Sequence, residues 1–364
     1  MTRNDIFARR WWTLAVLCTS LLVISLDNTI LNVALPTLVR DLGATSSQLQ
    51  WIVDSYVLVF AGLLLTAGAL GDRYGRRMAL FIGFAIFGIG SILSAWSGSA
   101  NHLIFTRAVM GIGGAFIMPA TLSILVNVFP REERPKAIAI WAATAGLGVP
   151  LGPVVGGWLL EHYWWGSIFL INVPIVIAAI IATIFVVPES KDPDVASLDP
   201  LGAILSIGGL AALLYAIIEA PNTGWLAGQT LTWAAVGVVL LAAFAIWEMR
   251  QDRPMLDMSL FRNPRFSAAS ISVTLVFFAM FGMLFFLTQY LQFVLNYTTL
   301  ETGVRVTPVV LGIMAGVGLG TRLAAKIGTK IVVSAGLAIV ALGLLNFARI
   351  TDTSGYSTVV ISLL

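Results

Sequence analysis

The sequence predicts an all-α polytopic membrane protein, and three observations support that prediction. Of its 364 residues, 58% are hydrophobic and 11% are charged, whereas soluble domains are about 25% charged. Apolar segments long enough to cross a bilayer recur along the chain, and most lysines and arginines fall in every second connection between them. Because one water-soluble core cannot bury so much apolar surface, we expect lipid to be the solvent.

A helix needs about 20 mainly apolar residues to span the hydrocarbon core, and this length identifies eleven complete segments. They are Trp11–Leu35, Trp51–Leu70, Met78–Trp96, Leu103–Phe129, Ala137–Leu160, Trp165–Val187, Leu201–Ile218, Leu231–Trp247, Phe266–Leu295, Val304–Leu323 and Ile331–Phe347. The first is too long for a signal peptide and is interpreted as an uncleaved span. A twelfth segment begins near Tyr356 and has only nine residues up to Leu364, so we expect a fragment truncated within span twelve.

The basic residues predict the orientation. With a cytoplasmic N-terminus, 17 of the 21 lysines and arginines fall in cytoplasmic connections, and only Arg40 and Arg349 fall on the other side. Arg107 and Arg305 lie within spans. Because cytoplasmic loops are enriched in positive charge, we expect a multi-pass protein of the cell (inner) membrane with its N-terminus in the cytoplasm.

Two polar links, Pro188–Pro200 and Arg250–Pro264, bracket a pair of spans. We therefore expect an N-terminal six-helix bundle at residues 1–190, two inserted linking spans at 191–250 and an incomplete C-terminal bundle at 251–364. A weak internal repeat supports two bundles, since Gly71–Arg77 has a faded counterpart at Ala324–Lys330 that pairs Gly75 with Gly328.

Several functional classes are disfavoured by composition. The net charge of +3 is too small to indicate nucleic-acid binding, and Cys18 is the sole cysteine. His102 and His162 lie at segment ends, so neither a metal site nor an intramembrane enzyme is expected. A sensor would need a sizeable soluble output domain, and ATP drive would need a phosphate-binding loop of the form GxxxxGK[ST], which is absent from the sequence.

Three charged residues fall inside predicted spans, where a charge is costly and marks a functional hypothesis. Asp27, Asp54 and Arg107 lie at similar depth in the outer half of spans one, two and four. Two carboxylates near one guanidinium cannot both be fully neutralised, so we expect one to bind a proton, a cation or both in turn. The alternatives are an inert buried pair between Asp27 and Arg107, and an Asp54 solvated at the outer rim.

Four motifs now point to a family. They are LDNTILNVALP at Leu26–Pro36, GALGDRYGRR at Gly68–Arg77, RAVMGIGGA at Arg107–Ala115 and GLGVPLGPVVGG at Gly146–Gly157. In this order, and together with WGSIFLINVP at Trp165–Pro174, they resemble the major facilitator superfamily, in particular its drug:proton antiporter branch with fourteen spans. The resemblance covers the whole chain and implies the major facilitator fold.

The resemblance assigns a conformational gate to the turn after span two. The gate residues are Gly68, Gly71, Asp72, Arg73, Gly75, Arg76 and Arg77. Asp72 and its neighbours would latch the two halves by meeting the positive end of a helix in the other half. A positive-inside loop would explain the arginines but not the acid.

The resemblance also assigns an antiporter helix motif to span five. The residues are Gly148, Gly152, Pro153, Gly156 and Gly157, and the glycines recur at spacings that leave a smooth stripe for helix contact. Pro153 is expected to kink the helix. Tight packing alone is the other interpretation, whereas the resemblance makes the stripe a mark of exporters.

The resemblance ties Asp27 and Arg107 to proton coupling. It places Asp54 at the position of an acid that helps recognise cationic drugs. From the second half, Gln289, Tyr290 and Arg305 are further candidates for substrate binding, although a helix-end anchor or a lipid-facing aromatic would explain them equally well.

The predicted function is therefore proton-coupled efflux of small cationic or amphipathic drug-like compounds. It needs no cofactor or metal, since the proton gradient is the energy source. The expected partners are the substrate, protons and the lipid bilayer, with no nucleic acid, and the expected state is a monomer. The alternative is export of an endogenous metabolite, lipid precursor or siderophore, with drugs as incidental cargo.

Replacing Asp54 tests its predicted role in substrate recognition. In Asp54→Asn the negative charge is lost, so export of monovalent and divalent organic cations should weaken while export of neutral compounds is kept. Efflux of matched charged and neutral fluorophores from cells measures the difference. Equal losses for both cargoes would contradict a charge-based role.

Overall fold

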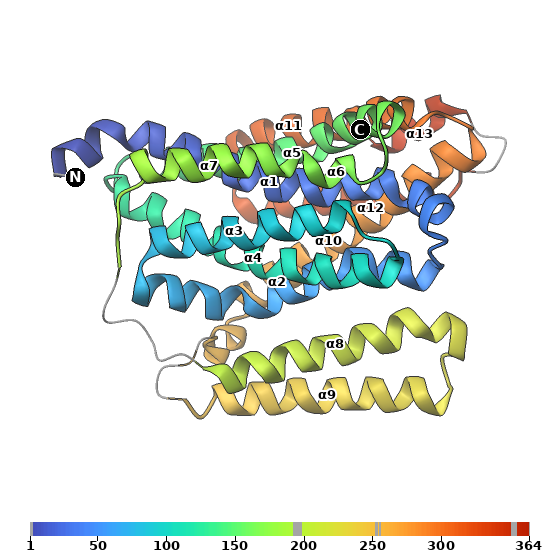
Figure 1. The fold of residues 1–364 in the computed structure, drawn as a ribbon, viewed down its shortest axis with the longest axis horizontal. Coiled ribbons are helices and arrows are strands. Elements are labelled where there is room, and N and C mark those ends of the chain that lie inside the picture. The colour runs from blue at the N-terminus through green and yellow to red at the C-terminus, as the bar shows by residue number, and fades with distance from the viewer. Residues whose placement is uncertain (1–2, 192–198, 252–253, 255, 351–354, 364) are drawn as a thin grey trace. The chain divides into compact units, whose positions relative to one another are not determined.

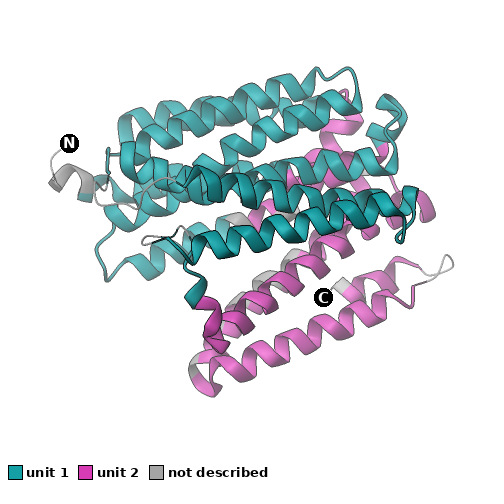
Figure 2. Cartoon of the chain, turned by 90° about the horizontal axis from the view of Figure 1, so that it is seen from below, with its two compact units in different colours: residues 1–27, 37–145, 165–259 teal, residues 28–36, 146–164, 260–364 magenta. Residues whose placement is uncertain are grey.

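A computed structural model describes residues 3–191, 199–251, 254, 256–350 and 355–363. Every regular element in these residues is helical, which confirms the all-α prediction (Figure 1). The chain divides into two compact units, which are coloured separately in Figure 2. Unit 1 comprises residues 1–27, 37–145 and 165–259, and unit 2 comprises residues 28–36, 146–164 and 260–364. Residues 192–198 of the expected polar link lie outside the described residues.

Unit 1 contains most of the first nine helices, which are α1 Arg3–Leu42, α2 Ser46–Tyr74, α3 Arg76–Ala95, α4 Ala100–Val128, α5 Arg134–His162, α6 Ser167–Leu170, α7 Asn172–Val186, α8 Pro200–Thr223 and α9 Gly228–Glu248. Two of them, α1 and α5, also contribute residues 28–36 and 146–162 to unit 2. Within unit 1, α4 packs against α2 and α3, and α3 packs against α7.

Unit 2 continues with a 3₁₀ turn at Met258–Arg262, of which the last three residues belong to this unit, and with α10 Pro264–Gln289, a π-helical turn at Tyr290–Val294, α11 Thr299–Ile327, α12 Thr329–Phe347 and α13 Tyr356–Leu363. A small apolar core lies where α10, the π-helical turn, α11 and α13 meet, centred on Leu287, Leu291 and Val306.

Among the described residues, ten helices are long and apolar enough to cross a membrane, counting α6 with α7 and α10 with the π-helical turn. They correspond to ten of the eleven predicted segments, with ends that differ by a few residues. The remaining segment, Val304–Leu323, lies inside the 29-residue α11, and its crossing stays a prediction. At the starts of α2 and α11 the helix begins several residues before the predicted apolar segment, and polar capping residues mark both starts.

The helix starts show this local control. Thr45 accepts a hydrogen bond from the Gln48 backbone N–H, and the Gln48 side chain accepts one from the Thr45 backbone. Thr298 and Glu301 form the same reciprocal pair at the start of α11. Such capping boxes satisfy N–H groups that have no partner within the helix, so each fixes where a helix begins.

Two glycines separate neighbouring helices in the same way. Gly75 has φ 134° and ψ 124° between α2 and α3, and Gly328 has φ 89° and ψ 148° between α11 and α12. A side chain rarely tolerates this backbone conformation, so each helix pair turns at one glycine. The two positions that the weak sequence repeat pairs therefore share one structural role.

The centre of unit 1 depends on close contact between α3 and α4. A methyl group added at Gly113 would lie 2.6 Å from the backbone N of Phe87 and 2.7 Å from the carbonyl O of Gly83. One added at Gly83 would lie 2.9 Å from the Gly113 carbonyl O. The glycines thus let the two backbones touch, as small residues do where membrane helices cross closely.

The two predicted inserted spans form the hairpin α8–α9, whose helices lie side by side (Figure 1). Helix α8 also packs on α2, because Ser47 hydrogen bonds to Glu219 and the rings of Trp51 and Tyr215 lie 6.3 Å apart. The hairpin is therefore tied to α2, to which it is not adjacent in sequence.

The contact between α3 and α4 predicts a stability change. Gly113→Val should lower the thermal stability of the detergent-purified protein, because backbone atoms cannot move aside as side chains do and overpacking costs about 1–3 kcal/mol. Gly282→Ala in α10 is the control, since an added methyl group there meets no atom within 4 Å. Equal melting temperatures for Gly113→Val and the unmodified protein would contradict this packing.

Candidate functional site

A buried ion pair joins α1 to α4. Arg107 Nη1 donates to Asp27 Oδ2, and the two side chains are 0% and 1% exposed. Removing both charges from water costs several kcal/mol per ion, so the pair persists only where further polar contacts accompany it. The structure thus brings together the acid and the base that the sequence assigned to proton coupling.

The other Asp27 oxygen has a second partner. Asn172 Nδ2, at the start of α7, donates to Asp27 Oδ1 at 2.9 Å and lies 3.4 Å from Ser91 Oγ of α3. Arg107 Nε donates to the Ile52 carbonyl O of α2 at 3.2 Å. Asn172 and Ser91 are fully buried, so five helices contribute to one polar network inside unit 1.

Aromatic rings cover the guanidinium. The Arg107 Cζ lies 4.4 Å from the ring centroid of Tyr56 and 5.9 Å from that of Phe169. A cation is attracted to the face of an aromatic ring, more strongly where water is excluded. The rings therefore stabilise the charge and keep water away from it.

One donor and one acceptor of this network remain unpaired among the described atoms. They are Arg107 Nη2 and Asn172 Oδ1, both buried. An unsatisfied buried polar atom costs about 1–3 kcal/mol, so these two atoms are places where a water molecule or a rearranged side chain would gain a hydrogen bond. Hydrogen bonds in the network can therefore be exchanged while the other contacts of Arg107 and Asn172 remain.

Asp54 does not join the pair. Its side chain makes no ion pair or hydrogen bond with any residue that the structure describes. It lies two residues from both Ile52 and Tyr56, which face α4, and two residues turn a helix by about 200°. The expected arrangement of two carboxylates around one guanidinium is therefore not observed. Asp54 is half-buried on another face of α2, and its role in binding stays a prediction.

The turn after α2 is fixed by residues beyond α7. Glu189 Oε1 accepts from the Arg77 backbone N–H at 3.2 Å, and the Ser190 carbonyl accepts from the Arg76 N–H at 2.9 Å. Glu189 lies so close to Gly75 that an added methyl group would be 2.8 Å from its Oε1. Glycine is thus required here by contact as well as by conformation.

The charged residues of the turn each have distinct surroundings. Asp72 Oδ1 accepts from Arg76 Nε at 2.6 Å, whereas Arg77 Nη2 donates to the Ile184 carbonyl at the end of α7 at 2.9 Å. Arg73 is exposed beside the ring of Tyr74. Gly68 is packed on α4, because a methyl group there would lie 3.3 Å from Pro119 Cβ. The latch to another half of the molecule stays a prediction.

Further basic residues lie at the same end of unit 1, which we call the basic end. Arg9 Nη1 donates to the Phe185 carbonyl at 3.1 Å, and Arg10 donates twice to Glu133, at 2.8 and 3.1 Å. The hydrogen bond from Arg10 lowers the pKa of Glu133. The basic end therefore joins the first part of α1 to the connection just before α5 and to the end of α7.

In unit 2 the glycine stripe of α5 packs on α1. A methyl group at Gly152 would lie 2.0 Å from Thr29 Oγ1, and one at Gly156 would lie 3.1 Å from Ile30 Cγ2. Thr29 Oγ1 donates to the Gly148 carbonyl at 2.7 Å, and Gly157 is also buried. The stripe is thus a close helix contact reinforced by a hydrogen bond.

The same part of α5 also contacts α11. A methyl group added at Gly303 would lie 2.2 Å from the carbonyl O of Pro153, and the backbone N–H of Leu300 donates to Glu161 at 3.3 Å. Because a proline leaves the carbonyl four residues earlier without its helical partner, its helix can bend there. Pro153 therefore lies where α5 meets a helix distant in sequence.

The remaining candidates lie in unit 2. Arg305 lies over the ring of Tyr297, 3.8 Å from its centroid, and is 3.8 Å from Glu301. These contacts resemble those of a helix-end anchor, which was the alternative interpretation. Gln289 Nε2 donates to the Phe285 carbonyl at 3.4 Å, and Tyr290 packs on the apolar core at the start of the π-helical turn. Such turns recur at functional sites.

Sequence reasoning missed Asn172, Glu189 and the contact of Thr29 with α5. Asn172 is within the quoted segment WGSIFLINVP, where a lone amide inside an apolar run was the available signal. Glu189 was an acid directly after span six, beside the expected basic loops. No three His, Cys, Asp or Glu side chains in the described part of the chain form a group that could hold a metal ion.

The buried pair predicts a strong energetic coupling. Arg107→Gln should destabilise the purified protein by about 3–5 kcal/mol, because Asp27 would be left as an unpaired buried charge. In the double variant Arg107→Gln/Asp27→Asn part of the thermal stability should return. Arg131→Gln, an exposed position, is the control. Additive losses in the double variant would show that the two side chains do not interact.

Comparisons with known proteins identify the family. Residues 17–364 match the model of the Major Facilitator Superfamily. The chain is 39% identical over 339 residues to the multidrug efflux pump LfrA of Mycolicibacterium smegmatis, covering 93% of this chain and 67% of that protein. It is 36% identical over 355 residues to the methyl viologen resistance protein SmvA of Salmonella typhimurium, covering 95% and 70%.

A solved structure supports the fold. The peptide transporter POT in complex with sulfate has a TM-score of 0.65 and 15% identity, covering 100% of this chain and 83% of that chain. The chain spans about two thirds of the length of the curated relatives named above. Because the family model matches nearly the whole chain and both relatives exceed 30% identity, this multi-pass membrane protein belongs to the Major Facilitator Superfamily of transporters.

Proposed function

We propose that the chain is part of a secondary active exporter that exchanges protons for small cationic or amphipathic organic compounds. The observation that carries the proposal is the fully buried pair of Asp27 and Arg107, with Asn172 on the second carboxylate oxygen. A buried charge in a membrane is costly and is retained where function needs it. The names of the relatives, a multidrug efflux pump and a methyl viologen resistance protein, support export of organic compounds.

Asp27 is the proposed proton carrier. When its carboxylate takes up a proton, the charge that attracts Arg107 disappears, and the guanidinium must find other acceptors. The proposal is supported by Arg107 Nη2 and Asn172 Oδ1, which have no hydrogen-bond partner among the described atoms and could each take a new one. Protonation thus changes the contacts between α1, α4 and α7, which is the kind of local charge change that biases a two-state element.

The direction of transport is proposed from α5. Thr29, two residues beyond Asp27 on α1, donates to the Gly148 carbonyl, and Gly152 packs on the same side chain. A change of partners at Asp27 is therefore transmitted along one helix to the contact with α5. The resemblance associates this glycine stripe with exporters, and the close contact of α5 with α1 is consistent with that proposal.

Cationic cargo is proposed from the half-buried Asp54 of α2, and methyl viologen, named in one relative, is an organic dication. Gln289, Tyr290 and Arg305 are the proposed contributions from unit 2. A carboxylate without a partner in a largely apolar span is the residue expected to attract a positive charge.

We further propose membership of the fourteen-span drug:proton antiporter branch. The hairpin α8–α9, packed on α2, supports this assignment because it is an extra pair of spans between the two halves. The gathering of arginines at the basic end supports a cytoplasmic location for that end, and with it a cytoplasmic N-terminus in the cell (inner) membrane. The proposed transporter is a monomer that needs no cofactor.

Replacing Asp27 tests proton coupling. Asp27→Asn keeps one acceptor oxygen, which can serve either Arg107 or Asn172, but it cannot take up a proton. Efflux of ethidium driven by a pH gradient should therefore be abolished in membrane vesicles. Asp41→Asn, an exposed acid on the same helix, should leave efflux unchanged.

Export of the fluorescent cation at the unmodified rate by Asp27→Asn would refute the role of this carboxylate. Efflux by the unmodified protein that is insensitive to collapse of the pH gradient would refute antiport altogether.

A further inference from the structure

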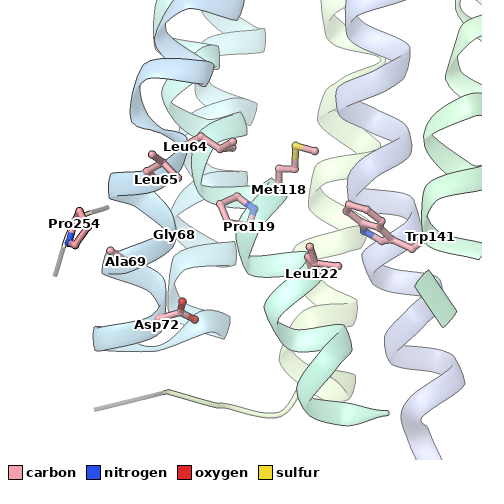
Figure 3. A pocket seen from close by; sticks show the side chains of 10 residues that line it. All are labelled: Leu64, Leu65, Gly68, Ala69, Asp72, Met118, Pro119, Leu122, Trp141 and Pro254. Atoms are coloured by element: carbon pink, nitrogen blue, oxygen red, sulfur yellow. The ribbon is translucent and has the colours of Figure 1, made fainter. Parts of the chain in front are cut away.

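A cavity of about 390 Å³ lies beside the gate turn, between the second half of α2 and the second half of α4. We call it the Asp72 cavity, and Figure 3 shows its lining. The lining residues are Leu64, Leu65, Gly68, Ala69, Asp72, Met118, Pro119, Leu122, Trp141 and Pro254. Its size falls within the range of about 300–1,000 Å³ that is typical of pockets for small organic molecules.

The walls combine apolar surface with one charge. Leucine, methionine and proline side chains form most of the lining, and Asp72 is the one charged residue among the described residues that line it. Figure 3 shows the Trp141 indole reaching toward Leu122. Trp141 is nine-tenths buried, and its Nε1 has no hydrogen-bond partner among the described atoms. Apolar walls, an indole and a carboxylate together suit an amphipathic organic cation.

Asp72 already has a cationic partner. Arg76 Nε donates to Asp72 Oδ1 at 2.6 Å, and the two side chains are 16% and 27% exposed. A second hollow of about 380 Å³ shares Leu122 with the Asp72 cavity, and its lining residues are Arg76, Leu122, Ser123, Val126, Asn127 and Arg134. One partner of the ion pair, Asp72, therefore lines the first cavity, and the other, Arg76, lines the second together with Arg134.

Arg76 is free to exchange partners without unfolding the turn. Its backbone N–H is held by the Ser190 carbonyl at 2.9 Å, and the next residue is held by Glu189. Only the Arg76 side chain must swing, and it already lines the second hollow. An ion pair that water can reach is weak, so another cation can displace it.

We propose that an amphipathic organic cation binds in the Asp72 cavity and displaces Arg76 from Asp72. This inference rests on the proposed export function and adds a cargo-recognition role to a residue assigned so far to the gate. Binding of cargo would break the charge contact that spans the turn between α2 and α3. Loading and gating would thus share one carboxylate, and the empty transporter would keep its turn locked by Arg76.

The proposal predicts opposite effects for the two partners of the ion pair. Tetraphenylphosphonium, a permanently charged apolar cation, is the probe, and equilibrium dialysis against the purified chain in detergent, without a pH gradient, is the measurement. Asp72→Asn should weaken binding about tenfold, and Trp141→Ala about threefold. Arg76→Gln should strengthen binding about threefold, because the carboxylate loses its competitor.

The controls separate the effect of the Asp72–Arg76 pair on binding from the effects of the protein's net charge and of the probe's size. Glu132→Gln and Arg131→Gln change the same charges at exposed positions in the connection between α4 and α5, and should leave binding unchanged. Triphenylphosphine oxide, a neutral compound of similar shape, should bind equally to the unmodified protein and to Asp72→Asn. Melting temperatures confirm that each variant is folded.

A gate without a cargo role gives a different result. If Asp72 and Arg76 only latch the turn, both variants should shift tetraphenylphosphonium binding in the same direction or not at all, and either result overturns the proposal. Absence of binding to the unmodified protein overturns it too. None of these results bears on antiport, which is judged by the pH-driven efflux of the Asp27→Asn variant.

Discussion

The buried contact between Asp27 and Arg107 sets the conditions that the rest of unit 1 satisfies. Two charges that lose their water must recover the cost through attraction and hydrogen bonds. The carbonyl of Ile52 and the ring of Tyr56 on α2, with the amide of Asn172 on α7, provide this compensation from two further helices. Helices α1, α2, α4 and α7 therefore all contact a single pair of charges. A change in the protonation of Asp27 would alter the contacts of all four helices.

Glycine makes that arrangement possible in two distinct ways. Between α3 and α4, Gly83 and Gly113 bring backbones into contact, so that residues on both helices can converge on the network. At the end of α2, Gly75 adopts a backbone conformation that other residues avoid and leaves room for Glu189. The backbone of the turn is consequently fixed, whereas its charged side chains can change partners. This combination suits a gate that must form and break ion pairs.

Much of the fold was predictable because it depends on local sequence. Apolar segments gave the helices, and the pairing of Gly75 with Gly328 anticipated two equivalent helix breaks. The pairing of Asp27 with Arg107 followed from their similar depth. Depth in the membrane, however, does not determine which face of a helix a residue occupies. For this reason the prediction that Asp54 lies beside Arg107 was wrong, and Asp54 lies on another face of α2. Asn172 and Glu189 were not predicted, because a single amide or acid forms no sequence motif and its partner is distant in the sequence.

The sequence by itself determined that this chain is a bundle of membrane helices of the Major Facilitator Superfamily, because hydropathy, basic connections and motifs are properties of neighbouring residues. The tertiary structure decided which residues come together: Asn172 contacts Asp27, Glu189 contacts the gate turn, and Trp141 and Asp72 line one cavity. The physical reason is that these contacts join residues dozens of positions apart. Their distance in space is set by how helices pack, and no local pattern records it.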